Sequence, residues 1–341
     1  MQILKKADVS IQGALRPAQP AAVVWKQPTL FQKLSSLLEN EAVLGYVLML
    51  PAAVIILMFI AYPFVLGVGL AFTDKLVGQA AHFIGFANYA EIFRSQIFWE
   101  TTYNTVVYTA VATVVKTVVG MYMALLLNRK FFFSRITRAT VLLPFIVPTV
   151  LSALAWLWMF DATFSVFNWI GRAFWQSQVT MFGVAVKTNW GYFRGINWLG
   201  DPFWAMTSII LVNIWRGVPF YAISFLAGLQ TVPQELYDAG DIDGANGWQK
   251  FWNVTLPLIK PIAVVVVVFS IVVTFADFQL VYVLTRGGPH NSTHLFATYA
   301  YQLSMVAGNL GQGAAVALFM FPFLAVLIVW QLWYLRRTEG A

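Results

Sequence analysis

Charged side chains are scarce in this chain of 341 residues, and cysteine is absent. Asp, Glu, Lys and Arg together make up 10% of the sequence, whereas a typical soluble domain contains about 25%. The absence of cysteine excludes disulfides, a thiol nucleophile and a cysteine-bound metal site. Hydrophobic residues make up 60%, and the mean hydropathy is +0.71. This composition predicts several membrane spans, so the net charge of +7 is no sign of nucleic-acid binding.

Six apolar segments are long enough to cross a bilayer, which takes about 20 residues. We therefore predict an all-α fold, a polytopic membrane bundle of six transmembrane helices. The third segment is the least regular, because it contains Pro144 and Pro148. Proline is tolerated in a span where neighbouring helices satisfy the freed carbonyl groups. The six segments are 43–72, 103–127, 140–160, 203–226, 262–284 and 314–335.

Basic residues are distributed unevenly between the two sides that these spans define. One side carries 13 Lys and Arg residues and the other carries 6, and the richer side is expected to be cytoplasmic. Both termini and the polar loop (229–261) fall on that side. We expect residues 1–41 to form a cytoplasmic tail without a signal peptide, and residues 42–341 to form the transmembrane domain. Within the tail, the amphipathic segment 30–39 is either a helix on the inner membrane surface or a frayed start of the first span.

The longest loop on the outer side, 161–202, is rich in tryptophan. Aromatic residues at this level often anchor a protein at the membrane interface. They are equally suited to contact a docking protein, and the sequence leaves both interpretations open. The four tryptophans are Trp169, Trp175, Trp190 and Trp198.

The polar loop carries residues at a specific spacing, from Asp238-Ala239-Gly240 through Gly244 to Val254-x-Leu256-Pro257. This pattern resembles the cytoplasmic "EAA" loop of ABC importer permeases, in which Glu-Ala-Ala is followed by three residues, Gly, nine residues and Ile-x-Leu-Pro. The departures are Glu to Asp, the second Ala to Gly, and Ile to Val. In that family the loop inserts into a groove on an ATPase, and the resemblance implies the same role for the loop of this chain. The residues to which it would assign coupling are Glu235, Asp238, Ala239, Gly240, Asp243, Gly244, Ala245, Leu256 and Pro257.

Local signals in the loop predict two short helices joined by a turn. Thr231 and Gln234 have the spacing of a capping box, with Pro233 in the first turn. Gly244 is expected to end the first helix, and Pro257 to stop the second. The alternative is an ordinary amphipathic loop with no coupling role.

Further motifs extend the resemblance over about residues 40–335, to the carbohydrate-uptake class of ABC permeases. They include Tyr62-Pro63, Trp215-Arg-x-x-Pro219-Phe220 and Leu284-Thr-Arg-Gly287-Gly288-Pro289. The resemblance implies a multi-pass protein of the bacterial cytoplasmic (inner) membrane that imports a sugar or sugar derivative. It implies as partners a second homologous permease, two ABC ATPase subunits, an extracytoplasmic substrate-binding protein and the lipid bilayer. ATP and Mg would be bound by the ATPase subunits, and this chain would bind no cofactor.

Three ionisable residues lie within the predicted spans. Such side chains are costly in lipid, and they usually face the bundle interior or a wet cavity. They would line a substrate path or, alternatively, pair with one another for structural reasons. Amide and aromatic side chains nearby suit sugar recognition but could equally join helices. The candidate path residues are Lys116, Asn213, Trp215, Arg216, Asp277, Gln279 and Tyr282.

Other chemistries find little support in the sequence. The nearest match to a phosphate loop, 183–188, has Val186 where the motif requires glycine, so we do not expect the chain to be an enzyme. His290 and His294 lack a third ligand, so we predict no metal site. The open alternatives are an ion-coupled secondary transporter, with Asp277 and Lys116 as a relay, and a non-transport scaffold or receptor. An inverted repeat would favour the secondary transporter, and none is visible.

Overall fold

The computed structural model describes residues 41–129, 132–176, 178–181, 184–187 and 195–339. The segment 30–39, for which we predicted a surface helix, lies outside the described residues, as does almost all of the predicted tail. Internal contacts divide the chain into two units, with the boundary between Pro63 and Phe64. The elements discussed below as a functional site all belong to the second unit.

The predicted membrane helix bundle is confirmed. Five described helices are long and apolar enough to cross a membrane, and a bent pair of helices makes a sixth candidate. The five are Glu41–Ala71, Gln96–Leu127, Pro202–Leu229, Gly247–Phe275 and Leu310–Arg337. In chain order the elements are α3 (Glu41–Ile56), a π-helical turn (Leu57–Ala61), α4 (Tyr62–Ala71), α5 (Ala87–Arg94), α6 (Gln96–Leu127), α7 (Ser134–Ile146), α8 (Thr149–Met159), α9 (Val166–Gln176), β1 (Gln178–Met181), β2 (Val184–Lys187), α10 (Pro202–Leu229), α11 (Gln234–Ile242), α12 (Gly247–Lys250), a second π-helical turn (Phe251–Thr255), α13 (Leu256–Phe275), α14 (Gln279–Leu284), α15 (Phe296–Tyr301), a third π-helical turn (Gln302–Val306) and α16 (Leu310–Glu339).

The first span is apolar on all its faces and buries almost none of them. Of its side chains, from α3 through α4, only Ala71 is buried. A helix that is hydrophobic all round must have apolar surroundings. Its faces are therefore suited to lipid or to another membrane protein.

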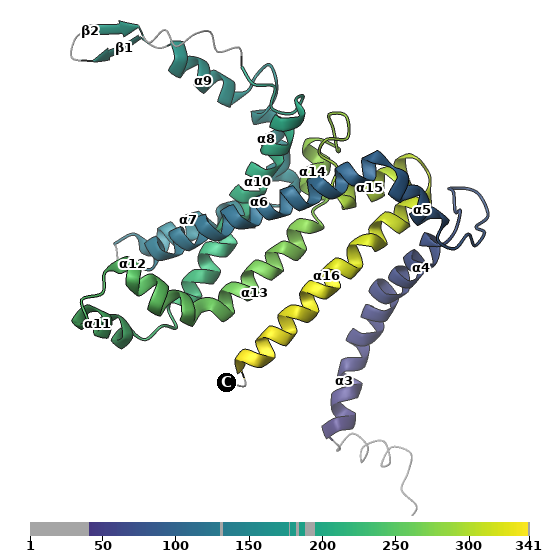
Figure 1. Cartoon of the computed structure of the whole chain (residues 1–341), viewed down its shortest axis with the longest axis horizontal. Coiled ribbons are helices and arrows are strands. Elements are labelled where there is room, and N and C mark those ends of the chain that lie inside the picture. The colour runs from purple at the N-terminus through teal and green to yellow at the C-terminus, as the bar shows by residue number, and fades with distance from the viewer. Residues whose placement is uncertain (1–40, 130–131, 177, 182–183, 188–194, 340–341) are drawn as a thin grey trace, which may run out of the picture. The chain divides into compact units, whose positions relative to one another are not determined.

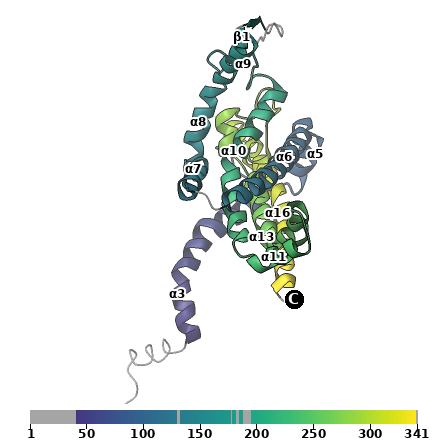
Figure 2. The ribbon, with the colours of Figure 1, turned by 90° about the vertical axis from the view of Figure 1, so that its left-hand side faces the viewer.

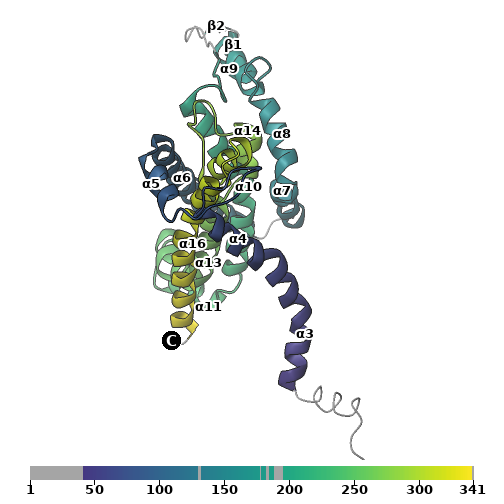
Figure 3. The ribbon, with the colours of Figure 1, turned by 90° about the vertical axis from the view of Figure 1, so that its right-hand side faces the viewer.

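The second unit is organised around α6 and α10, which pack closely against each other (Figure 1). A Cβ atom added at Gly120 of α6 would lie 2.4 Å from the Cβ of Tyr221 on α10, so this approach requires glycine. α13 packs on both helices, and α16 packs on α13. Figures 2 and 3 show α11 and the C-terminal end of α16 at one end of this unit, and α9 at the other. Apolar clusters around Tyr108, Phe98 and Phe225 fill the contacts between these helices.

The third predicted span, 140–160, is broken rather than straight. Helices α7 and α8 meet at an angle of 88°. The break falls at Val147, whose ψ of 131° is extended. Val147 precedes Pro148, and the proline ring disfavours helical geometry in the residue before it. The proline thus divides the segment into two helices.

The fifth predicted span, 262–284, was wrong at both ends. The long helix begins at Gly247 and ends at Phe275, and 276–278 separate it from α14. This break contains neither Gly nor Pro, so the sequence carried no signal for it. As a consequence, Asp277 lies in a non-helical connection rather than inside a span.

The loop 161–202, which we predicted to lie on the outer side, contains the exception to the all-α prediction. After α9, strands β1 and β2 form an antiparallel hairpin in which Gln178 pairs with Lys187. Trp198 packs against Phe160 and Phe167 at the foot of the loop, whereas Trp169 is exposed. Trp190 lies outside the described residues.

Candidate functional site

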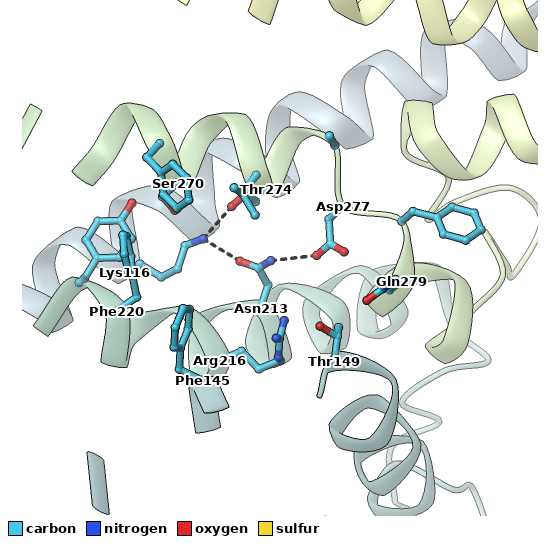
Figure 4. A pocket seen from close by; sticks show the side chains of 16 residues that line it. Lys116, Phe145, Thr149, Asn213, Arg216, Phe220, Ser270, Thr274, Asp277 and Gln279 are labelled. Carbon is cyan, nitrogen blue, oxygen red and sulfur yellow. Dashed lines mark hydrogen bonds between the residues drawn. The ribbon is translucent and has the colours of Figure 1, made fainter. Parts of the chain in front are cut away.

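Segments that are far apart in the sequence meet around one polar cavity of about 500 Å³ in the second unit (Figure 4). Its walls come from α6, from the α7–α8 break, from α10, and from α13 with the connection that follows it. Five of the seven candidate path residues line it: Lys116, Asn213, Arg216, Asp277 and Gln279. The full lining is Lys116, Phe145, Thr149, Asn213, Arg216, Gly217, Phe220, Tyr221, Phe269, Ser270, Val273, Thr274, Ala276, Asp277, Phe278 and Gln279.

Lys116 is almost completely buried, with 2% of its surface exposed. Its Nζ donates hydrogen bonds of 2.8 Å to the Asn213 Oδ1 and of 2.8 Å to the Thr274 Oγ1. The Nζ also lies 5.9 Å from the centroid of the Tyr221 ring. The direct hydrogen-bond partners of this ammonium group are therefore neutral oxygen atoms rather than a carboxylate.

Asp277 is held by hydrogen-bond donors from three segments. Its Oδ2 accepts from the Tyr108 hydroxyl at 2.7 Å and from the Asn213 Nδ2 at 3.1 Å. Its Oδ1 accepts from the backbone N–H of Leu280 at 3.4 Å. The structural pairing of Asp277 with a cation takes an indirect form here, because Asn213 bridges the carboxylate and Lys116. One amide thus connects α6, α10 and the end of α13.

Arg216 extends from α10 into the same cavity. Among the described residues, its Nε has no hydrogen-bond partner, and the guanidinium has no carboxylate within 4.0 Å. It therefore differs from Lys116, whose Nζ donates two hydrogen bonds.

The other two candidate path residues do not line the cavity. Trp215 makes an edge contact with Trp156, with 5.4 Å between the ring centroids. Tyr282 stacks on Phe278 at 5.0 Å and contacts Tyr301. Both belong to aromatic clusters beside the cavity.

Two members of the network escaped the sequence analysis, namely Tyr108 and Thr274. Both are uncharged polar residues inside long apolar helices, where many threonines simply bond to their own helix. Their partners lie 169 and 158 residues away in the chain. No local pattern pointed to them.

His290 and His294, the pair considered as metal ligands, do not line the cavity. The Nδ1 of His294 is 3.2 Å from the Thr298 Oγ1, and burial lowers the pKa of His294 to about 4. Within the described part of the chain, no group of three or more His, Cys, Asp or Glu residues could hold a metal ion.

The polar loop forms a separate polar feature at the other end of α13. α11 contains no buried residue, and Ile242 is 88% exposed. At the turn, Gly244 has a φ of +74°, which strains most other residues. The Ala245 N–H donates to the Gly240 carbonyl at 2.8 Å. The Lys250 Nζ then joins the two helices by an ion pair of 2.6 Å with Asp241, a residue that the motif did not single out.

All nine residues of the EAA-like pattern are accessible to some degree. Six are exposed, and the other three are half-buried. The half-buried residues are those that pack the turn or begin α13. The exposed residues are Glu235, Asp238, Ala239, Asp243, Gly244 and Pro257, and the half-buried ones are Gly240, Ala245 and Leu256.

Two local predictions for the loop were wrong. Thr231 does not cap α11, because its hydroxyl donates to the Gly228 carbonyl at the end of α10 at 2.8 Å. The capping box lies instead at α12, between Asn246 and Gln249. Pro257 does not stop a helix either, since the π-helical turn before it leads directly into α13. Proline is tolerated in a first turn, where its missing N–H is not needed.

These features together define a membrane protein with a polar cavity among its helices and a helical loop projecting from one end. The chain belongs to the family of binding-protein-dependent transport system inner membrane components, whose model matches residues 116–340. It is therefore a multi-pass membrane component of a transport system. This membership decides against the secondary transporter and the scaffold.

Curated relatives cover most of the chain. The trehalose/maltose transport system permease protein MalF of Thermococcus litoralis is 33% identical, over 84% of this chain and 92% of that protein. The sulfoquinovosyl glycerol transport system permease protein SmoG of Agrobacterium fabrum is 36% identical, over 83% of this chain and 87% of that protein. The diacetylchitobiose uptake system permease protein DasB of Streptomyces coelicolor is 30% identical, over 87% and 88%.

The fold also matches solved structures. A chain of a bacterial ABC transporter that imports the acidic polysaccharide alginate superposes with a TM-score of 0.71. It is 22% identical, and the match covers 89% of this chain and 99% of that chain. A chain of a bacterial alginate ABC transporter in complex with a periplasmic protein that holds an alginate pentasaccharide gives a TM-score of 0.71 at 21% identity, over 88% of this chain and 96% of that chain. The predicted ABC importer permease fold is thus confirmed.

Proposed function

We propose that this chain is a permease subunit of an ABC importer that takes up a sugar or sugar derivative. The permeases MalF, SmoG and DasB, by their names, carry sugars or sugar derivatives, which supports a solute of this class. The cavity supports it as well, because amide and carboxylate groups can bond sugar hydroxyls while aromatic rings cover the apolar face of a sugar ring. Asn213, Gln279 and Asp277 supply the first kind of group, and Phe220 and Phe269 supply the second.

The observation that carries the proposal is the continuity between the projecting loop and the cavity. One helical stretch, Gly247–Phe275, begins in the polar loop. Thr274 lies at its far end, and Asp277 follows two residues after the last helical residue, Phe275. A continuous helical stretch of this length spans about 40 Å. A displacement of the loop would therefore also displace the wall of the cavity.

The proposal assigns the remaining tasks to partner chains. Two ABC ATPase subunits would grip the loop and bind ATP and Mg, so that this chain itself hydrolyses no ATP. A second, homologous permease would complete the path, and an extracytoplasmic binding protein would deliver the solute. Both termini and the loop would be cytoplasmic, as the uneven distribution of basic residues predicts.

The decisive experiment changes the backbone of the loop without changing its contacts. A Cβ at Gly244 would meet no atom within 4 Å, so a substitution acts there through its effect on φ alone. Valine is strained at positive φ, whereas asparagine tolerates it. We expect Gly244→Val to reduce solute uptake and binding-protein-stimulated ATP hydrolysis at least tenfold in the reconstituted complex, and Gly244→Asn to retain most of both.

The affinity of the binding protein for its solute serves as an internal reference, since that chain is unchanged. Stimulation of the Gly244→Val complex to the level of the unaltered complex would show that the loop does not couple ATP hydrolysis to transport.

A further inference from the structure

The charges that line the polar cavity do not cancel. Its ionisable lining residues are Lys116, Arg216 and Asp277, so with all three ionised the cavity carries one excess positive charge. One carboxylate, Asp277, thus faces two cations. Lys116 donates hydrogen bonds to Asn213 and Thr274, whereas the Nε of Arg216 has no hydrogen-bond partner among the described residues.

No carboxylate of the described residues forms a direct ion pair with Arg216, although Asp277 acts on it electrostatically from beyond 4.0 Å. In the described part of the chain no carboxylate lies within 4.0 Å of its guanidinium, and its buried Nε has no acceptor. Figure 4 shows Arg216 among the polar lining residues, on the same wall as Asn213 and near Thr149. A charged side chain within a membrane protein is costly and marks a functional path unless an opposite charge meets it.

The chemistry of the guanidinium indicates what would meet it. Its planar array of donors matches the paired oxygen atoms of a carboxylate, sulfonate or phosphate group. A neutral sugar offers only hydroxyl groups, which the amides of Asn213 and Gln279 already suit. The cavity of about 500 Å³ leaves room for a sugar ring beside an anionic substituent.

We propose that the solute is an anionic sugar or sugar derivative, and that Arg216 binds its carboxylate, sulfonate or phosphate group. This inference rests on the proposed function and specifies the substrate class of the same cavity. The alternative is that Arg216 pairs with a carboxylate of the second permease. The test below distinguishes that pairing from binding of an anionic solute.

The test uses pairs of sugars that differ only in the anionic group. Sulfoquinovosyl glycerol and glucosyl glycerol form one pair, and a disaccharide with a terminal glucuronate and its glucose counterpart form another. The binding protein of the importer is first screened against both members of each pair by thermal shift. Uptake of the bound members is then measured in proteoliposomes that contain the complete importer.

We expect the anionic member to bind and to be transported. Arg216→Gln should lower its uptake at least about tenfold, the factor that 1.4 kcal/mol of lost interaction produces, and Arg216→Lys should restore part of it. Uptake of any neutral member that is carried should change less than twofold. Arg336→Gln, at the exposed end of α16, removes a positive charge away from the cavity and should leave both rates unchanged.

The contrary outcomes are distinct from one another. Binding and transport of neutral sugars alone would overturn the anionic class while leaving sugar import intact. An equal loss for both members in Arg216→Gln and Arg216→Lys would show that the arginine pairs with a partner chain. If the binding protein binds no sugar of either kind, the proposed function itself fails.

Discussion

The polar cavity and the polar loop are held together in opposite ways. In the cavity, the hydrogen bonds that Lys116 and Asp277 make with other side chains join residues 64 to 169 positions apart. In the loop, the capping box of α12 and the ion pair of Lys250 join residues only 3 to 9 positions apart. The cavity therefore exists only when several helices are packed, whereas the loop builds its own shape.

This difference suits the two tasks that we propose. A locally built loop can keep its shape while it moves with an ATPase, because its contacts travel with it. A cavity assembled from distant helices changes shape as soon as those helices shift. Since α13 links the two, a rigid displacement of the loop would rearrange the hydrogen bonds of Asn213 and Asp277 without deforming the loop itself.

The largest effect should follow from removing the carboxylate of Asp277. In Asp277→Leu the Tyr108 hydroxyl and the Asn213 amide lose their acceptor, and each unsatisfied buried group costs about 1–3 kcal/mol. We expect uptake to fall more than about tenfold while the complex still assembles, because Asp277 and the Asn213 amide both line the polar cavity. Uptake assays and size-exclusion profiles of the purified complex measure the two effects.

Asp277→Asn is the matched control for that experiment. It retains an oxygen acceptor of the same shape, so it should keep a larger share of uptake than Asp277→Leu does. If the leucine variant transports at the rate of the unaltered protein, the network of Asp277 has no part in transport.

A smaller effect is expected from Tyr108→Phe, which removes one donor of Asp277 and keeps the ring in the apolar cluster. Asp277 retains its bonds from Asn213 and Leu280, so we expect a loss of about 1 kcal/mol and uptake lower by about fivefold. Tyr103→Phe alters an exposed tyrosine of the same helix and should change uptake little. Equal effects of the two variants would remove Tyr108 from the network.

How far the sequence could predict the cavity follows from these long separations. Lys116, Arg216 and Asp277 stood out because an ionisable residue in an apolar run is unusual. Thr274 did not, since a threonine hydroxyl in a helix usually bonds the carbonyl one turn before it, and Tyr108 did not, since an uncharged aromatic residue is ordinary in an apolar helix. Nor could the sequence show that Asn213, rather than a direct ion pair, joins Lys116 to Asp277. That arrangement depends on how three helices pack.

Helix boundaries were predictable where proline or glycine determined them locally. The turn at Gly244 was predicted. The break before Pro148 was not, but Pro148 had already marked the third span as irregular. The break at 276–278 was missed, because its causes are contacts rather than residues with special backbone preferences. Pro257 was misinterpreted as a helix stop for the opposite reason: proline fits equally well near the start of a helix, and a π-helical turn supplies that start.

The smallest effect should come from the ion pair between Asp241 and Lys250, although it is the shortest contact between α11 and α12. Exposed ion pairs contribute about 0.2–1 kcal/mol, and the Asp241 side chain is 63% exposed. The turn at Gly244 and the capping box of Asn246 and Gln249 keep the loop in shape without it. We therefore expect Lys250→Gln to lower binding-protein-stimulated ATP hydrolysis less than about twofold. The difference from the unaltered complex should shrink further in high salt, which screens exposed charges. The double exchange Asp241→Lys with Lys250→Asp should return the activity to its original level.

A loss in Lys250→Gln as severe as that expected for Gly244→Val would mean that one ion pair, and not the backbone, sets the shape of the loop. The contrast between a locally built loop and a cavity assembled over long separations would then have to be abandoned.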